Sequence, residues 1–280
     1  MSENFGSPGA MQPLSPGNVV SAAVRLYRSH LKTYFKQATI AHLWALVPVY
    51  GWAKCAATAA LISRLAFGEL VYQPESVAEA SRHINARLWS FLRVSFQVGL
   101  SLFGVYILLA IAGGIISFII GLVFGALLGS GGIIVGSGLA IAVMAITMLV
   151  GLTWFYARWV VAEVPLAVEE NINGAQSVDR SWELTNASVL RIQGVVLVAF
   201  LVTFPIVGIL NYLPSIYIVK LEPGSTLYWI VYSLSIITSL IGGILVMPFW
   251  QALKAVLYFD LRSRREGLGL QLREPPQDLR

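Results

Sequence analysis

The chain has 280 residues, of which 57% are hydrophobic and only 12% are charged, and its formal net charge is +5. Its mean hydropathy of +0.74 lies outside the range of soluble domains, so we expect an integral membrane protein. The length leaves room for about six membrane spans with short connections. The single cysteine, Cys55, excludes an internal disulfide and leaves the redox compartment open.

The chain begins with a segment rich in Pro and Gly that has no apolar core of signal-peptide type, so residues 1–15 are expected to be a disordered cytosolic tail. Ser15 before Pro16 is typical of a helix start. The apolar residues that follow recur at helical spacing and are Val20, Ala23, Val24, Tyr27 and Leu31. This pattern predicts an amphipathic helix on the membrane surface.

Two further amphipathic helices are predicted, each just before a hydrophobic stretch. One opens at Pro74 and Glu75, and its apolar stripe consists of Val77, Ala80, Ile84 and Leu88. The other can be capped by Asn173 and carries Val178 and Trp182 on its apolar side. We therefore expect three units along the chain, each a surface helix followed by a helical hairpin.

The span count is hardest to settle at residues 37–69, which form either one kinked span or a hairpin of two short spans. The positive-inside rule favours six spans, because nearly all basic residues then fall on one side. This count places both termini in the cytosol. It also divides the chain into a membrane domain at 16–262 and a basic cytosolic tail at 263–280, so the expected fold class is an all-α, polytopic membrane bundle.

The longest hydrophobic stretch runs from Val94 to Ala157 without one charged residue. We expect two spans here, joined by a glycine-rich turn. The first of them carries small residues spaced four apart, namely Gly113, Ser117, Gly121, Gly125 and Gly129. Such a ridge lets another helix approach closely, whether by packing inside the protein, in a homo-oligomer, or along a pore.

Charged residues near the ends of the later spans are expected to form one cytosolic ion-pair layer. Its candidate members are Arg158, Glu163, Arg180, Asp260 and Arg262. We expect Asp260 or Glu163 to pair with one of the three arginines, because an unpaired charge is costly at low dielectric. A proton or substrate relay is the alternative role for such a layer. His42 stands alone in its apolar segment and is interpreted as a packed helix residue.

The sequence has no motif that indicates catalysis. It contains no zinc-protease motif, no paired cysteines, no nucleophile elbow and no phosphate-binding loop, so we expect neither an enzyme nor a cofactor. Its basic residues lie in predicted cytosolic loops and tails, where anionic lipid headgroups are the expected partners. A folded basic surface for nucleic acid is not apparent.

Three segments carry a resemblance to a known family. They are Leu14-Ser15-Pro16-Gly17 with Arg25-Leu26-Tyr27-Arg28, then Arg180-Ser181-Trp182-Glu183-Leu184-Thr185, and finally Tyr258 to Gly267. Together they resemble the membrane-domain family named after glycerophosphoryl diester phosphodiesterase and related bacterial six-span proteins. The resemblance implies a six-span fold in a bacterial inner membrane. It implies no activity, because the three histidines here match none of the family's phosphodiesterase elements.

Two function classes remain at this stage. The first is a scaffold or accessory protein whose surface helices and basic tail gather lipids, a protein partner or a second copy at the cytosolic face. The second is a transporter or channel for a small or lipid-like solute. The scarcity of charge within the spans favours the first class.

Overall fold

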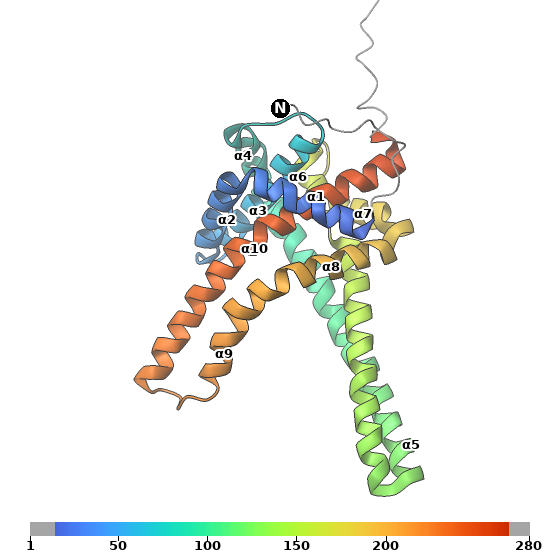
Figure 1. Cartoon of the computed structure of the whole chain (residues 1–280). Coiled ribbons are helices and arrows are strands. Elements are labelled where there is room, and N and C mark those ends of the chain that lie inside the picture. Colours follow the sequence, from blue (N-terminus) through green and yellow to red (C-terminus); the bar gives the residue numbers. More distant parts are fainter. Residues whose placement is uncertain (1–14, 269–280) are drawn as a thin grey trace, which may run out of the picture.

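The computed structural model describes residues 15–268, and these residues fold as an all-α protein, as expected (Figure 1). The elements in chain order are α1 (Pro16–Ser29), α2 (Leu31–Ala45), α3 (Tyr50–Leu70), α4 (Val77–Ala86), α5 (Leu88–Trp159), α6 (Glu163–Val168), α7 (Gly174–Thr185), η1 (Asn186–Ser188), α8 (Val189–Val207), η2 (Gly208–Tyr212), α9 (Leu213–Ile218) and α10 (Thr226–Glu266). The expected tail at residues 1–15 falls almost entirely outside the described residues, as does most of the tail at 263–280. Residues 263–266 continue α10.

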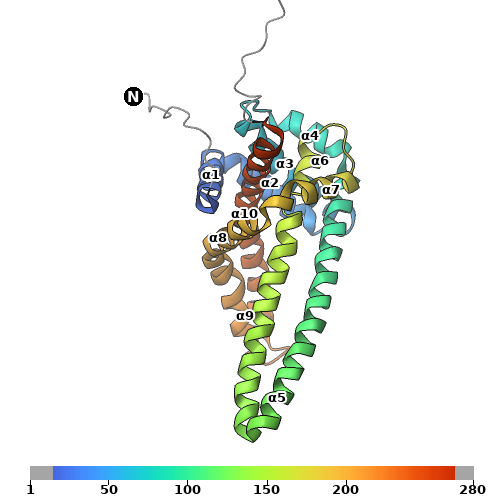
Figure 2. The same ribbon diagram turned by 90° about the vertical axis from the view of Figure 1, so that its right-hand side faces the viewer.

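Three helical stretches are long and apolar enough to cross a membrane, namely Leu88–Val168, Gly174–Ile218 and Thr226–Glu266. The first contains a hairpin, because Gly129 adopts a non-helical conformation with φ 60° and ψ −141°. Its two arms run side by side for most of their length (Figure 2). The other two stretches form a second hairpin, which turns between α9 and α10.

Most buried side chains lie at one end of the molecule, which we call the head. The head consists of α1–α4, α6, α7 and the adjoining ends of α5, α8 and α10, and its fully buried residues include Tyr34, Phe91 and Tyr258. From the head, the α5 hairpin and the α9–α10 hairpin project as two legs that diverge (Figure 1). In the most apolar 18-residue segment of the α5 stretch and of α10, only 6% of the segment is buried inside the protein, as expected for helices solvated by lipid.

Two of the three predicted helix starts are confirmed, after Ser15 and after Asn173, whereas α4 begins at Val77 and not at Pro74. Ser15 caps α1, and its hydroxyl accepts a hydrogen bond from the Asn18 backbone N–H. Ser76 and Glu79 form a capping box at α4, as Asn173 and Gln176 do at α7. These reciprocal bonds satisfy backbone donors that the first helical turn leaves free, so each helix begins at a defined residue.

The apolar faces of the amphipathic helices were expected to lie on lipid, but they pack against other helices of the protein. In α1, Val19, Val20 and Ala23 are buried, and the helix packs against α8 and α10. Likewise, Ile84 of α4 is buried beside α3 and Val178 of α7 is buried in the head. Their apolar stripes therefore hold the head together, because protein rather than lipid covers them.

Residues 37–69 form a helical hairpin and not one kinked helix. The chain turns between Ala45 and Tyr50, and Val49 takes a positive φ of 60° at the turn. The α2 arm has 15 residues. A helix of that length rises about 22 Å, less than the roughly 30 Å of a bilayer's hydrocarbon core. The Lys54 ammonium at the start of α3 donates to Asn85 of α4 over 2.9 Å, which ties this arm to the head.

The first arm of the last hairpin is a continuous but irregular helix. Instead of ending, α8 continues through a five-residue π-helix, η2, into α9, and the turn begins only after Ile218. Pro205 precedes the π-helix and has no backbone N–H to donate within α8. π-helical turns of this kind often lie at functional sites, so the residues around η2 are candidates for such a site.

Candidate functional site

The charged residues of the head pair in three separate groups, and neither Asp260 nor Glu163 has one of the expected partners. Asp260 is 6% exposed and pairs with Arg191 of α8 and, over 3.0 Å, with Arg264 one turn further along α10. The expected partners Arg180, Arg262 and Arg158 do not contact it. The carboxylate therefore joins α8 to α10.

Arg180 and Arg262 belong to a second cluster. Both pair with Glu266 near the end of α10, and Arg262 does so over 2.8 Å. Arg180 also reaches Glu169 over 3.6 Å, and Glu169 accepts a hydrogen bond from the buried Tyr258 hydroxyl. This cluster joins α7 to α10 and to the segment that follows α6.

Glu163 forms a third, separate pair. Its carboxylate lies 2.8 Å from the Lys254 ammonium, and each side chain is 17% exposed. The pair lines a cavity of about 200 Å³ together with Tyr156 and apolar side chains of α5. It connects α10 to the start of α6, where burial makes the loss of either partner costly.

Arg158 has no acidic partner among the described residues and is held by aromatic rings instead. Its guanidinium carbon lies 3.8 Å from the centroid of the Trp182 ring, and Nη1 donates to Asn186 over 3.1 Å. The residue is 3% exposed, and its Nε has no hydrogen-bond partner in the described structure. A cation over an indole face is attracted by the ring quadrupole, so Arg158 fixes α7 to the end of α5.

Sequence reasoning missed two arginines that bind backbone carbonyls near α6. Arg64 pairs with Glu75 over 2.7 Å and donates to the Ala167 carbonyl over 2.6 Å. Arg87 donates to the carbonyls of Leu166 and Glu169. Basic residues often cap helix C-termini in this way, but α6 has only six residues and its apolar sequence gave no helix signal.

The small-residue ridge of the first α5 arm faces the second arm in part. A side chain at Gly113 would begin 2.6 Å from the Met144 sulfur, and the Ser117 hydroxyl donates to the Ala140 carbonyl over 3.1 Å. A side chain on Gly125 would make only ordinary contact, with Ile133 at 3.5 Å. Gly121 has open space at its own Cβ position, and Gly129 forms the turn. Packing within the hairpin thus uses part of the ridge.

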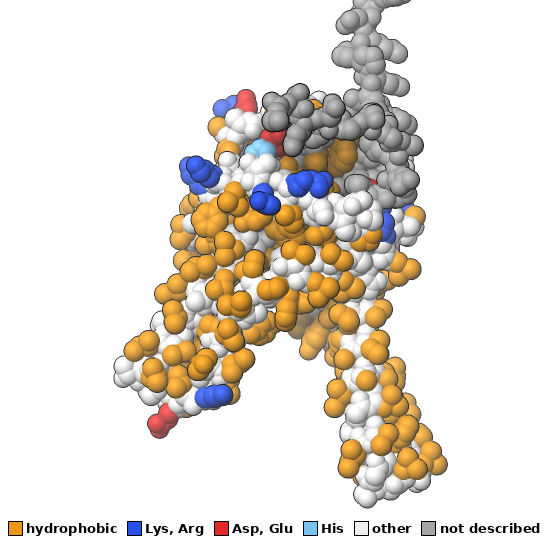
Figure 3. Space-filling view, viewed as in Figure 1, with side chains coloured by type: hydrophobic (Ala, Val, Ile, Leu, Met, Phe, Trp, Pro, Cys, Tyr) orange, Lys and Arg blue, Asp and Glu red, His pale blue; other side chains and the backbone are white. Residues whose placement is uncertain are grey.

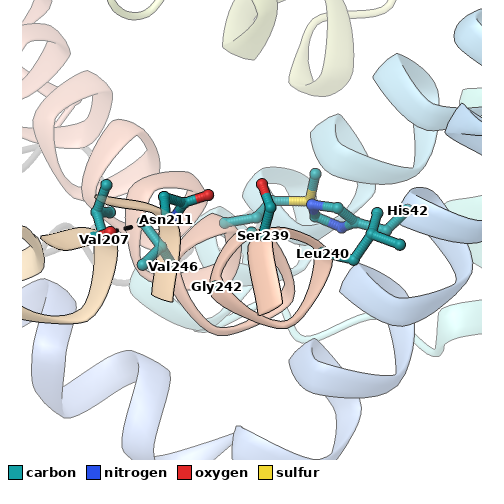
Figure 4. Close-up of a pocket in the computed structure, with 9 residues that line it drawn as sticks. His42, Val207, Asn211, Ser239, Leu240, Gly242 and Val246 are labelled. Atoms are coloured by element: carbon teal, nitrogen blue, oxygen red, sulfur yellow. Dashed lines mark hydrogen bonds between the residues drawn. The ribbon is translucent and has the colours of Figure 1, made fainter. Parts of the chain in front are cut away.

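A cavity of about 450 Å³ lies where α2, η2 and α10 meet (Figure 4). Its polar residues are Asn211 of η2, His42 of α2 and Ser239 of α10, with Ser239 between the other two in the close-up. The His42 Nδ1 lies 2.8 Å from the Ala38 carbonyl, and the Asn211 amide nitrogen donates to the Val207 carbonyl over 3.3 Å. No charged side chain of the described residues lines this cavity.

Basic side chains gather on α1 and α2, at the border between the head and the apolar legs (Figure 3). Those that are exposed are Arg25, Arg28, Lys32 and Lys36. No ion pair joins them to another residue of the described range 15–268. Glu69 of α3 lies 3.3 Å from the Nε2 of His30, which stands between α1 and α2. This face is therefore free to attract anions.

Within residues 15–268, no group of three or more His, Cys, Asp or Glu side chains is close enough to hold a metal ion. Comparison of the chain with protein-family models, curated proteins and solved structures gave no match. The features of the described residues that bear on function are the charged head, the basic face and the cavity.

Proposed function

We propose that this chain is a scaffold or accessory protein that organises anionic lipids, and through them or beside them a protein partner, at the cytosolic face of a bacterial inner membrane. The observation that carries the proposal is the exposed basic face of α1 and α2 beside two apolar legs. Each basic side chain near a membrane surface adds about 1 kcal/mol of attraction to anionic lipids. The family resemblance supports the membrane and the bacterial setting, and itself remains a proposal.

The head supports this role through its rigidity. Ion pairs and hydrogen bonds join α5, α6, α7, α8 and α10 at one end of the molecule, as in the Asp260–Arg191 and Glu163–Lys254 pairs. A surface fixed in this way keeps its pattern of charge, which favours binding to a defined partner. The α5 hairpin adds no comparable ionic network, because no charged residue lies between Arg93 and Arg158.

The proposed topology places both termini in the cytosol. The arms of α5, the α8–α9 segment and α10 are the proposed full spans, since each lies in a stretch that can cross a membrane. Because α2 is short and Lys54 is bonded to the head, we propose that the α2–α3 hairpin enters the bilayer and returns without crossing it. The six-span count would require this hairpin to cross twice.

Anionic lipid retention tests the proposed function. The purified protein is placed in nanodiscs with phosphatidylcholine and a small share of phosphatidylglycerol, and the lipids that remain bound after dilution are measured by mass spectrometry. We expect enrichment of phosphatidylglycerol around the wild-type chain. Substituting Arg25, Arg28, Lys32 and Lys36 by Gln should abolish most of it, because the attraction is electrostatic.

The matched control is Arg82→Gln, which removes an exposed cation from α4 and leaves the basic face of α1 and α2 intact. It should retain nearly all of the enrichment. The proposal is wrong if the fourfold variant binds phosphatidylglycerol as the wild type does, or if high salt leaves the retention unchanged.

Transport of a small or lipid-like solute is the alternative, and the cavity at His42, Asn211 and Ser239 is the observation that favours it. Polar residues deep in a span often mark a substrate pathway. Flux of such a solute into reconstituted vesicles, lost when the cavity is filled by Gly243→Leu, would replace the scaffold proposal with this one.

A further inference from the structure

The cavity between α2, η2 and α10 lies far from both ends of the α10 helix. Tyr228, Trp229 and Tyr232 form an aromatic cluster near its start, as is common at a membrane interface, and Lys254 marks the polar end in the head. At 1.5 Å per residue, Ser239 is about 15 Å from Trp229 and about 22 Å from Lys254 along the helix. The cavity is therefore at middle depth in the bilayer.

Two adjacent glycines make room for the two polar side chains that flank Ser239. A Cβ on Gly243 would lie 2.3 Å from the His42 Nε2, and a Cβ on Gly242 would lie 3.2 Å from the Asn211 Nδ2. His42 and Asn211 come from different helices, so each glycine admits a separate polar group to the same turn of α10. Simple helix packing does not require a polar group at either contact.

Hydrogen bonding leaves acceptor capacity in the cavity. The Ala38 carbonyl can only accept, so the His42 Nδ1 donates to it, and Nε2 makes no hydrogen bond to another described residue. The Asn211 Oδ1 and the Ser239 hydroxyl make no hydrogen bond to another described residue. A group with a hydroxyl can donate to one of the two ring or amide acceptors and accept from the Ser239 hydroxyl, because it both donates and accepts.

The lack of charge restricts what can bind. A phosphate or an ammonium group at this depth would have no counter-ion among the lining residues, and an unpaired charge is expensive there. The remaining walls are apolar side chains of α8 and α10 such as Val207 and Met247. A second cavity of about 320 Å³ adjoins at Asn211 and Ser239 and adds Ser215 and Ser235 to the polar seam.

We propose that this cavity binds an uncharged lipid with a free hydroxyl group, such as a diacylglycerol. Its hydroxyl donates to His42 or Asn211 and accepts from the Ser239 hydroxyl, while its acyl chains leave between the helices into the bilayer. The volume of about 450 Å³ suits a glycerol-sized headgroup. This binding does not depend on the lipid-organising role of the basic face, because the two sites share no residue.

Photolabelling of the full-length protein in nanodiscs tests the site. The probe is a diacylglycerol with a diazirine in the first carbons of one acyl chain, and labelled peptides are identified by mass spectrometry. We expect labels on α2, η2 and the middle of α10. Unlabelled dioleoylglycerol should compete, and its O-methyl ether should compete at least about fivefold less well, as expected when a hydrogen bond to the cavity is lost.

Two serines of α10 provide a matched pair of variants. Ser239→Ala removes a hydroxyl from the cavity, whereas Ser233→Ala removes one that is exposed elsewhere on the helix. Labelling should fall in Ser239→Ala and stay at the wild-type level in Ser233→Ala. His42→Phe, which keeps a ring but removes the acceptor, should also reduce it. If His42→Phe does not fold, the serine pair and the ether competitor still decide the matter.

Three results would each overturn the proposal. The first is that the ether competes as well as dioleoylglycerol, and the second is that the two serine variants are labelled equally. The third is that labels are found only outside α2, η2 and α10, or are not found at all, as expected if the cavity holds only water. Phosphatidylglycerol retention is measured on the same samples to distinguish failure of the cavity proposal from failure of the scaffold proposal. Because Ser239→Ala leaves the basic face intact, it should not change this retention.

Discussion

Asp260 shows how a carboxylate can be kept near the end of a long apolar helix. Two arginines face it, Arg191 from α8 and Arg264 from its own helix. Burial increases the loss of stability when one partner of such a pair is removed, because the other charge then remains unpaired in a low-dielectric site. The same reasoning predicts a large effect for Arg191 and a small one for the more exposed Arg264.

We predict that Asp260→Asn lowers the free energy of unfolding by about 3 kcal/mol. A double-mutant cycle with Arg191→Gln should give a coupling energy of about 1–3 kcal/mol, measured by chemical unfolding in detergent micelles. The control is the cycle of Asp260→Asn with Arg180→Gln. Because Arg180 belongs to the Glu266 cluster, those two effects should add; strong coupling there would contradict the structure.

Glu79 gives a prediction that depends on pH. Hydrogen bonds from the Ser76 hydroxyl and from its backbone N–H hold the pKa of the Glu79 carboxyl below its usual range. A depressed folded pKa means that the cap stabilises α4 above the unfolded pKa and is lost as pH falls through the folded one. Protection of α4 amides from hydrogen exchange, corrected for intrinsic rates, should therefore decrease in acid.

Glu79→Gln is the control for this effect, because the amide can still accept from Ser76 but does not titrate. Its α4 protection should be nearly independent of pH over the acid range. Equal acid sensitivity in Glu79→Gln and the wild type would show that another group is responsible.

At the scale of elements, the α5 hairpin depends on glycines of its second arm as well as its first. A Cβ on Gly132 would lie 1.9 Å from the Phe124 carbonyl oxygen, and one on Gly136 would lie 2.8 Å from the Phe124 Cβ. The ridge was predicted on the first arm alone, although Gly132, Gly136 and Ala140 of the second arm have the same spacing of four residues. Close contact between the two arms needs small residues on whichever arm faces a bulky side chain of the other. The spacing of residues within one helix does not show which positions those are.

Gly136→Leu should destabilise the hairpin by about 1–3 kcal/mol, because the added side chain must push the arms apart. Gly138→Leu is the matched control, since a Cβ there meets nothing within 4 Å. Thermal unfolding in detergent should show a lower Tm for Gly136→Leu and a nearly unchanged one for Gly138→Leu. Equal melting of the two variants would mean that the arms do not pack as described.

At the scale of the whole molecule, the position of the α2–α3 hairpin decides the topology. Accessibility of single cysteines, introduced in a Cys55→Ser background, can locate each turn. A cysteine at Gly224 should react with a membrane-impermeant reagent from the periplasmic side. One at Pro48 should not, because the short hairpin stays within the bilayer or the head.

A cysteine at Asp179 is the control for the cytosolic side and should react only after the membrane is opened. Reaction of the Pro48 cysteine from the periplasm would restore the six-span count. Failure of the Gly224 cysteine to react there would contradict the proposal that α8–α9 and α10 cross.

The sequence by itself determined most of the helices, the starts at Ser15 and Asn173, and the apolar stretches, because caps and hydrophobic periodicity are local properties. Only the tertiary structure decided that the amphipathic helices cover the head, that Asp260 pairs with Arg191, and that two glycines bring His42 and Asn211 to one cavity. Such contacts join residues far apart in the chain. They depend on where whole helices lie, which no local pattern of side chains specifies.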